Sequence, residues 1–203
     1  MGKLKKKEYR KSGIKPSHNC YSYFLDEIND NHAELCKKRR KKNKKYKCLK
    51  PQPGYAAGYN RSKKLTKKNY NCKELVKRTL ADNKSIYKTT KKAKCKKNYY
   101  KGALFIDPYK DFHYYREDTP GNWSHKQGRH IPSSYDAKGK PIKDPEKAAK
   151  RYKSSTKSHY YNKLCSYFCL PRHTKKNMQA LPKKKFMGLF GGTQRRTRKQ
   201  RIV

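Results

Sequence analysis

Acidic residues are scarce in this sequence. The 203 residues include 14 Asp and Glu against 57 Lys and Arg, for a formal net charge of +43 at pH 7. Such an excess of one sign works against compactness through self-repulsion, although it does not specify a fold. The shortage of acid therefore predicts a dense polyanion as the partner or neighbour of this chain.

Long apolar runs are also missing. No stretch approaches the roughly 20 apolar residues that cross a bilayer, so we expect no membrane span. The start of the chain, MGKLKKKEYRKSG, is basic, but no apolar region follows it. This pattern argues against a secretory signal. We therefore expect an intracellular protein, not a secreted one.

The sequence also lacks an even number of cysteines, which a complete set of disulfides would need. The chain has seven, and disulfides are rare in intracellular proteins, so the sequence predicts no disulfide framework. Metal binding or thiol chemistry is then the alternative to simple packing of these side chains.

Aromatic residues, by contrast, are abundant. Low hydrophobicity with high net charge usually indicates disorder, but 18 Tyr and 6 Phe supply large buried areas. The length allows one domain and a tail. We expect a basic extension at 1–11, a folded domain at 12–172 and a basic tail at 173–203.

The first half of the domain has helical periodicity. Apolar residues at helical spacing predict one helix over about 20–36 and another over about 70–82. Between them, 37–50 (KKRRKKNKKYKCLK) carries ten Lys or Arg. This insertion is typical of an exposed, mobile loop.

The second half changes to strand-like patterns. Residues 102–118 (GALFIDPYKDFHYYRED) and the turn at 119–123 predict two or three antiparallel strands. Residues 134–152 are rich in turns, with a short helix expected from Pro145, and 160–171 predict a last strand. Helices followed by an antiparallel sheet indicate an α+β fold.

Cys20 is the candidate nucleophile. It stands at the start of the first predicted helix, where backbone N–H groups and positive potential favour a thiolate. Such a thiol needs a base, and His113 lies inside a strand-like run that would fix its direction. A third polar group would orient the imidazole. His125 is our first choice, because we expect Asp111 to point to the opposite face of the strand.

The same residues allow a simpler interpretation. Cys20 can be a small buried hydrophobe, and His113 a strand histidine with satisfied hydrogen bonds. Cysteine followed by histidine is a weak signal, because any chain with several of each contains such pairs.

Four blocks of the sequence resemble a known family. HNCYSYFLDEI, KPQPG, DPYKDFHYYREDTPGNWSHKQG and CSYFCLP are similar to an uncharacterised family of large nucleocytoplasmic DNA viruses, or giant viruses, with bacterial relatives. The resemblance covers most of 12–171. Gln127 stands where the relatives have Pro, which affects a turn and not the chemistry.

The resemblance implies a fold and a set of roles. The Cys and His blocks are similar to the NlpC/P60 and CHAP branch of papain-like cysteine hydrolases. By position, Cys20 would be the nucleophile, His113 the base and His125 the orienting residue. The Cys20 backbone N–H, with Asn19 or His18, would hold the oxyanion. The substrate would be an amide or peptide bond, and no cofactor is implied.

A zinc site is a third hypothesis. Cys165, Cys169 and His173 have C-x3-C-x3-H spacing, and Cys48, Cys72 or Cys95 could supply a fourth ligand. However, we expect Cys165 and Cys169 to share one strand face. Four residues along a strand separate thiols by about 13 Å, too far for one ion. We therefore predict no metal.

The basic segments predict electrostatic binding. Contacts with phosphates release counterions, so binding would weaken steeply with added salt. No base-reading motif is present, which favours non-specific contact with nucleic acid or with an acidic virion surface. The residues that we expect to bind the polyanion are Lys37, Lys38, Arg39, Arg40, Lys41, Lys42, Arg195, Arg196 and Arg198.

Two functions therefore remain from the sequence. The first is a viral papain-like cysteine hydrolase, made in the host cytoplasm or viral factory. It is also a candidate for packaging in the virion. The second is a non-catalytic basic virion protein that binds DNA or capsid. The first requires the Cys20 sulfur and the His113 imidazole within hydrogen-bond reach, at the floor of an open groove.

Overall fold

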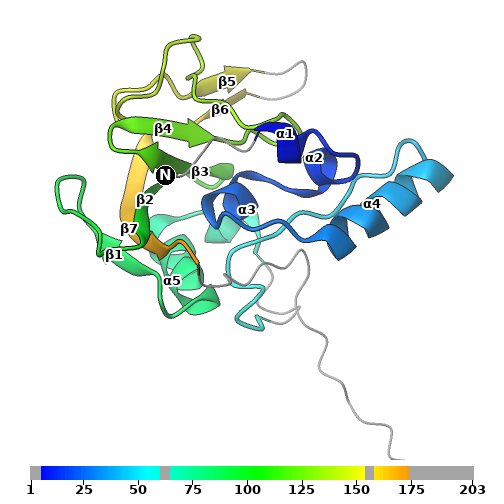
Figure 1. The fold of residues 1–203 in the computed structure, drawn as a ribbon, viewed down its shortest axis with the longest axis horizontal. Coiled ribbons are helices and arrows are strands. Elements are labelled where there is room, and N and C mark those ends of the chain that lie inside the picture. Colours follow the sequence, from blue (N-terminus) through cyan, green and yellow to red (C-terminus); the bar gives the residue numbers. More distant parts are fainter. Residues whose placement is uncertain (1–5, 60–64, 154–157, 174–203) are drawn as a thin grey trace, which may run out of the picture.

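The computed structural model describes residues 6–59, 65–153 and 158–173. Its main feature is a five-stranded antiparallel sheet in the order β1-β7-β2-β3-β4 (Figure 1). These strands are β1 (Tyr87–Thr89), β2 (Tyr99–Asp107), β3 (Asp111–Thr119), β4 (Asn122–His125) and β7 (Lys163–Pro171). A separate two-stranded sheet pairs β5 (Arg151–Lys153) with β6 (Ser158–Tyr160).

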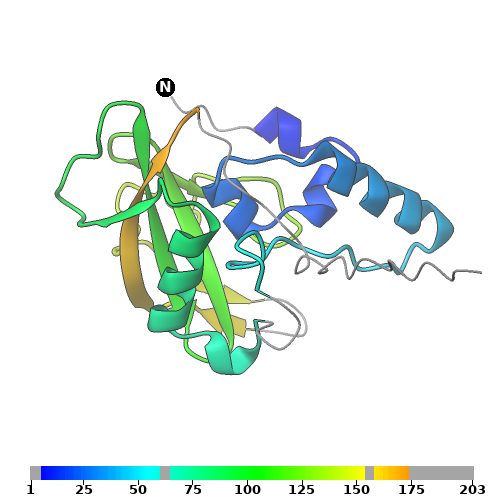
Figure 2. The ribbon, with the colours of Figure 1, turned by 90° about the horizontal axis from the view of Figure 1, so that it is seen from below.

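The described helices all precede β1 in the chain. They are α1 (Lys6–Tyr9), α2 (Ile14–Ser17), α3 (Cys20–Phe24), α4 (Asp30–Lys42), the short 3-10 helix η2 (Lys67–Asn69) and α5 (Cys72–Asp82). Figures 1 and 2 show α3 and α5 close to the sheet, whereas α4 extends away from it. This order of helices and antiparallel strands confirms the α+β class.

The two faces of the main sheet carry different cores, because successive strand residues point to opposite faces. On one face, Leu104 and Ile106 pack with residues of α3 and α5, among them Phe24 and Leu75. On the other face, Phe105 belongs to a second cluster with Tyr115, Trp123, Ile142, Tyr161 and Tyr167. The sheet therefore has no solvated face of the usual antiparallel kind around β2 and β3.

The predicted helix over 20–36 is two helices. The chain leaves α3 at Leu25, and Asp26 takes a positive φ of 55°. The Asp26 carboxylate accepts a hydrogen bond of 2.6 Å from the Arg116 guanidinium on β3. Arg116 is buried, so pairing with this carboxylate offsets its desolvation. A long-range ion pair therefore accompanies the break that helical periodicity did not predict.

Asp82 connects the end of α5 to the loop at 51–59. Its carboxylate accepts hydrogen bonds from the Tyr21 hydroxyl and from the backbone N–H groups of Gly54 and Ala57. Burial nevertheless raises the pKa of Asp82 to about 6. The helix predicted over 70–82 is otherwise confirmed, starting at Cys72.

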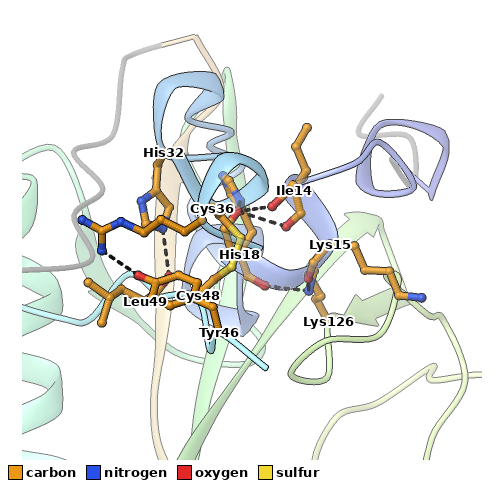
Figure 3. The surroundings of a disulfide bond; sticks show 12 residues. Ile14, Lys15, His18, His32, Cys36, Tyr46, Cys48, Leu49 and Lys126 are labelled. Carbon is orange, nitrogen blue, oxygen red and sulfur yellow. Dashed lines mark hydrogen bonds between the residues drawn. A yellow bond between two sulfur atoms is a disulfide. The ribbon is translucent and has the colours of Figure 1, made fainter. Parts of the chain in front are cut away.

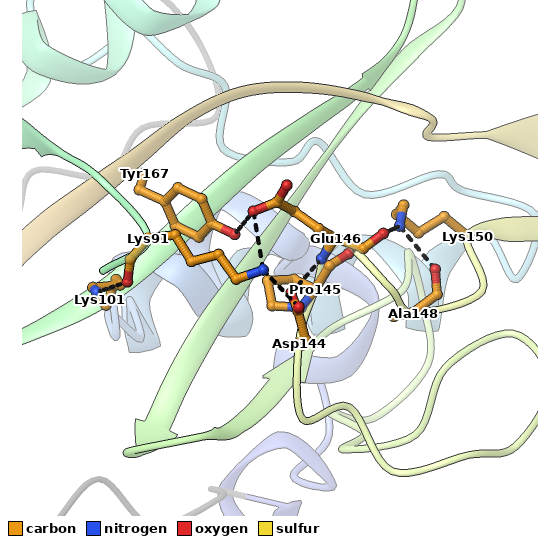
Figure 4. A network of polar contacts seen from close by, with 8 residues as sticks. All are labelled: Lys91, Lys101, Asp144, Pro145, Glu146, Ala148, Lys150 and Tyr167. Carbon is orange, nitrogen blue, oxygen red and sulfur yellow. Dashed lines mark hydrogen bonds and ion pairs between the residues drawn. The ribbon is translucent and has the colours of Figure 1, made fainter. Parts of the chain in front are cut away.

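Residues 134–150 cover the second face of the sheet through polar contacts (Figure 4). The Lys91 ammonium donates to the Asp144 carboxylate at 2.6 Å, and the Tyr167 hydroxyl donates to Glu146 at 2.8 Å. Lys150 donates to the carbonyls of Pro145, Glu146 and Ala148. The short helix expected from Pro145 is wrong, since 145–148 form turns.

Three disulfides correct the prediction that the chain has no disulfide framework. They join Cys36 to Cys48, Cys72 to Cys165 and Cys95 to Cys169. The remaining Cys20 is the free cysteine. The odd number of cysteines thus reflects six paired residues and one buried thiol.

Two predicted boundaries also change. The basic extension at 1–11 includes Tyr9, which is buried and packs edge-on against Tyr23. In the insertion at 37–50, residues up to Lys42 continue α4, and Cys48 is tied back to Cys36. Most of the predicted tail, 174–203, lies outside the described residues.

Candidate functional site

Cys20 lies at the start of α3 because Asn19 caps that helix. The Asn19 side chain accepts from the Ser22 N–H at 3.2 Å, and the Ser22 hydroxyl accepts from the Asn19 N–H at 2.9 Å. This reciprocal pair is a capping box, which fixes where the helix begins. The predicted position of Cys20 at a helix start is therefore confirmed.

The Cys20 thiol occupies an edge of β3 that β4 leaves uncovered. The pairing of β4 begins at Tyr115, opposite His125, and continues away from Phe112. At this uncovered edge the Cys20 sulfur lies 3.9 Å from the Phe112 carbonyl oxygen. The same sulfur accepts a hydrogen bond from the Tyr114 backbone N–H. The sulfur therefore lies beside the peptide groups that flank His113.

Burial controls the chemistry of this thiol. Cys20 is only 6% exposed, and burial raises the pKa of its thiol to about 12. The Tyr114 hydrogen bond and the charges of Lys50 and Lys126 lower this pKa, but their effect is smaller than that of desolvation. At neutral pH the group is a thiol and not a nucleophilic thiolate.

His113 and His125 form the pair that the sequence predicted. The His113 Nε2 atom lies 2.7 Å from His125 Nδ1, and His125 Nε2 lies 3.1 Å from the Tyr135 carbonyl. Because a carbonyl only accepts, His125 carries its proton on Nε2 and accepts at Nδ1. His113 therefore donates from Nε2, which leaves its Nδ1 unprotonated in the neutral ring.

Both rings are neutral because they are buried. Each is 2% exposed. Burial lowers the pKa of His125 to about 4 and that of His113 well below its usual value, and His125 lowers the latter further. An imidazole in this state is a poor proton acceptor at neutral pH.

Tyrosines enclose this pair. The Tyr161 ring stacks on His113 with centroids 4.9 Å apart, and the Tyr152 ring lies 5.6 Å from that of His125. The Tyr161 hydroxyl donates to Asp111 at 2.8 Å. The expectation that Asp111 points away from His113 is therefore wrong, because strand residues two apart share a face.

The structure brings together only part of the predicted triad. No hydrogen bond joins the Cys20 sulfur to the His113 imidazole in the described ranges. All three side chains are buried, and the thiol and both imidazoles are neutral at pH 7. The arrangement therefore lacks the open groove and the thiol–imidazole contact that catalysis would require in this conformation.

The two predicted oxyanion residues are bonded to the chain itself. The Asn19 amide donates to the Pro51 carbonyl at 2.8 Å. His18 is fully buried, accepts from the Asn29 N–H through Nε2 and contacts the Ser17 hydroxyl through Nδ1 at 2.7 Å. Burial lowers the pKa of His18 to about 3. Both side chains thus support the local fold.

Lys126 is a buried residue that the sequence analysis missed (Figure 3). Its ammonium is fully buried and donates to the carbonyls of Lys15, His18 and Gly128 at 3.1, 2.6 and 2.7 Å. Burial lowers its pKa to about 7. Its only sequence signal was its place in the SHKQG block, since a lysine among 57 basic residues does not stand out.

The predicted basic residues of α4 lie at the surface. Lys38, Lys41 and Lys42 are exposed, and Lys37 and Arg40 are half-buried. The Arg39 guanidinium donates to the Tyr46 hydroxyl at 2.8 Å. Figure 3 shows the Cys36–Cys48 bond near Tyr46 and near the bond of His32 to the Leu49 carbonyl. Arg195, Arg196 and Arg198 lie outside the described residues.

The zinc hypothesis is wrong. Cys165 and Cys169 are in separate disulfides, and the described part of the chain holds no cluster of three or more residues that could bind a metal ion. The two cysteines also lie on different faces. A bulge beside Leu104 and Phe105 changes the register of β7. As a result, Cys165 packs with the core on the helix side of the sheet, whereas Cys169 lies on the other face, the face of Tyr167.

Comparisons with known proteins add one short match. No family model matches this chain, and no solved structure matches it. "Insoluble matrix shell protein 1" of Ruditapes philippinarum is 48% identical over 46 residues, which are 23% of this chain and 31% of that protein. Separately, no helix among the described ranges is long and apolar enough to cross a membrane.

Proposed function

We propose that this protein acts by binding a polyanion and not by catalysis. The observation that carries this proposal is the contrast in charge state within one chain. The thiol and imidazoles of the predicted triad are buried and neutral, whereas the basic side chains of α4 are exposed or half-buried. The available chemistry is therefore electrostatic.

The shape of the α4 region supports this role. The helix extends away from the sheet (Figure 2), and Glu34 is its only acid after the first turn. The Cys36–Cys48 bond ties the following loop to it. A projecting, covalently braced helix with four basic residues in its last turn can approach a phosphate backbone without displacing the core.

The disulfides indicate where such a protein would work. Disulfides persist in oxidising surroundings, which include secreted proteins and the surfaces of virions. They argue against the predicted intracellular location. They remain compatible with assembly into a virion, as the resemblance to giant-virus proteins suggests, and with a shell matrix, as the name of the matched protein suggests.

A papain-like cysteine hydrolase is the second candidate. The Cys20 sulfur beside the backbone of His113, the His113–His125 hydrogen bond and the unprotonated Nδ1 of His113 favour it. This function needs a second conformation in which the tyrosines move and the thiol reaches the imidazole. A reactive Cys20 would favour this candidate over polyanion binding.

The test of the first proposal is salt-dependent binding. We expect the full chain to bind a fluorescent DNA duplex of arbitrary sequence at low salt, with log K falling linearly as log[salt] rises. A second duplex of unrelated sequence should bind equally well. Absence of binding at 50 mM salt, or affinity that does not change with salt, would overturn the proposal.

A further inference from the structure

A basic cleft lies where three segments of the chain meet. Its volume is about 610 Å³, and its walls come from 10–16, from α4 and from 129–130. Seven of the eleven residues that line it are Lys or Arg, and none is acidic. The three arginines are Arg10, Arg40 and Arg129. Each therefore reaches the cleft from a different segment.

The walls of this cleft are held by buried contacts and not by the charges themselves. Gly13 has φ +88°, and a Cβ there would lie 2.3 Å from the Ala33 carbonyl, so α2 and α4 approach closely. The Ser17 hydroxyl donates to the Gly13 carbonyl. Lys126 joins the Lys15 and Gly128 carbonyls, which connects α2 to the third wall. The convergence of charge is thus built into the fold.

The arginines of the cleft have no polar partners among the described residues. Across the described parts of the chain, the side chains of Arg10, Arg40 and Arg129 form no ion pair or hydrogen bond, and among the four lysines of the cleft only Lys37 forms an ion pair, with Glu34 at 3.6 Å. Like charges around one cavity repel each other. A bound anion would relieve this repulsion and use the free guanidinium donors.

We propose that this cleft binds adjacent phosphate groups. A carboxylate offers two oxygens in one plane and a single negative charge, so one guanidinium fork can contact both oxygens and neutralise it. A phosphate offers oxygens in several directions, so guanidiniums from different segments can contact it together. A cleft of this size accommodates a nucleotide-sized ligand. The source is a nucleic-acid strand or a free polyphosphate.

This inference rests on the proposed polyanion binding and adds a defined site to it. The diffuse charge of α4 alone would bind any polyanion in proportion to the number of its charges. A built cleft instead makes affinity depend on three particular arginines. The two explanations therefore differ in how they respond to equal losses of charge at different places.

The experiment compares two triple variants of the full chain. One changes Arg10, Arg40 and Arg129 to Gln. The control changes Lys84, Lys92 and Lys94 to Gln, which are exposed and lie near β1, at the sheet edge opposite β4. Binding of inorganic tripolyphosphate and of a fluorescent 12-nucleotide single strand is measured for each, after urea unfolding shows that both variants fold.

We expect the arginine variant to lose about tenfold in affinity and the lysine control about two- to threefold. Changing the same arginines to Lys should weaken binding with the salt dependence unchanged, because charge is kept and the planar fork is lost. Binding of tripolyphosphate by the wild type would identify a free polyphosphate as a sufficient ligand, and binding of the strand alone would identify a nucleic-acid backbone.

Equal losses in the two glutamine variants would overturn the cleft while leaving general polyanion binding intact. Polyglutamate binding as tightly as the strand, with the same dependence on the arginines, would overturn the preference for phosphate. Absence of any wild-type binding at low salt would remove both proposals together.

Discussion

The thiol–imidazole group and the basic cleft are neighbours with opposite properties. Cys20, His113 and His125 lie within the fold with their charges removed by burial. The cleft arginines lie at the surface or half-buried, without a compensating acid. Lys126 stands between the two regions, because its ammonium caps carbonyls behind the cleft and its charge acts on Cys20.

This difference teaches how one sequence can place reactive residue types where they cannot react. A nucleophile needs an ionised state and access, and burial opposes both. A phosphate site needs only charge held in place, which a few buried contacts behind the surface supply. The residue types alone did not distinguish these outcomes.

The reactivity of Cys20 gives the largest expected effect. A highly reactive thiol would contradict the contrast between a neutral, buried thiol–imidazole group and an accessible basic cleft. With a thiol pKa of about 12, iodoacetamide at pH 8 should label Cys20 about a thousandfold more slowly than an exposed cysteine. After unfolding without reductant, mass spectrometry should find one label per chain, because six cysteines are paired. Fast labelling that depends on His113 would instead establish an activated thiol–imidazole pair and favour the hydrolase.

Acid should destabilise the neutral region. His18, His113 and His125 bind protons less readily when folded than when unfolded. The contribution of these three rings to stability is therefore complete above about pH 6.5 and falls as the pH decreases. Between pH 7 and 5, His18 and His125 should each remove about 2 kcal/mol of unfolding free energy, His113 should remove more in the same direction, and Asp82, whose pKa is raised, should return about 1 kcal/mol.

Urea unfolding at the two pH values measures this loss, for which we expect a net value of more than about 3 kcal/mol. His125→Asn should reduce the loss of unfolding free energy between pH 7 and 5 by about 2 kcal/mol, the contribution of one histidine. His130→Gln, at an exposed position, should leave it unchanged. A stability that stays constant between pH 7 and 5 would contradict the neutral state of these rings.

Replacing Lys126 tests the connection between the regions. Lys126→Met leaves three carbonyls without their donor, so we expect a loss of about 3 kcal/mol in unfolding free energy. Lys150→Met removes the same number of bonds, but within one local turn. It should lose only about 1 kcal/mol. Equal losses would show that the long-range contacts of Lys126 add nothing.

The smallest effect should come from the glycine behind the cleft. Gly13→Ala and Gly139→Ala both place a side chain at positive φ, but only Gly13 meets the backbone of another helix, whereas nothing lies within 4 Å of Gly139. Both should lose about 1 kcal/mol from backbone strain. Gly13→Ala should lose about 1 kcal/mol more and weaken phosphate binding. Identical urea midpoints and affinities for the two variants would contradict the close approach of α2 and α4.

Strand patterns were predictable where the signal is local. The alternation and turns in 102–123 placed His113 and His125 on neighbouring strands, because register follows from a tight turn and a period of two. The same period of two places Asp111 on the same face as His113, so the expectation that Asp111 points to the opposite face did not follow from the strand pattern. The break in the first helix was not predictable, since it accompanies an ion pair between Asp26 and Arg116, 90 residues apart.

By itself the sequence determined the excess of positive charge, the α+β class, the helix start at Cys20 and the facing of the two histidines, all of which depend on composition or on neighbours in the chain. Only the tertiary structure decided which cysteines pair, how deeply the triad is buried, and which of 57 basic residues meet in one cleft. The physical reason is that pairing and desolvation depend on what packs around a side chain, and in this fold those neighbours come from distant parts of the chain.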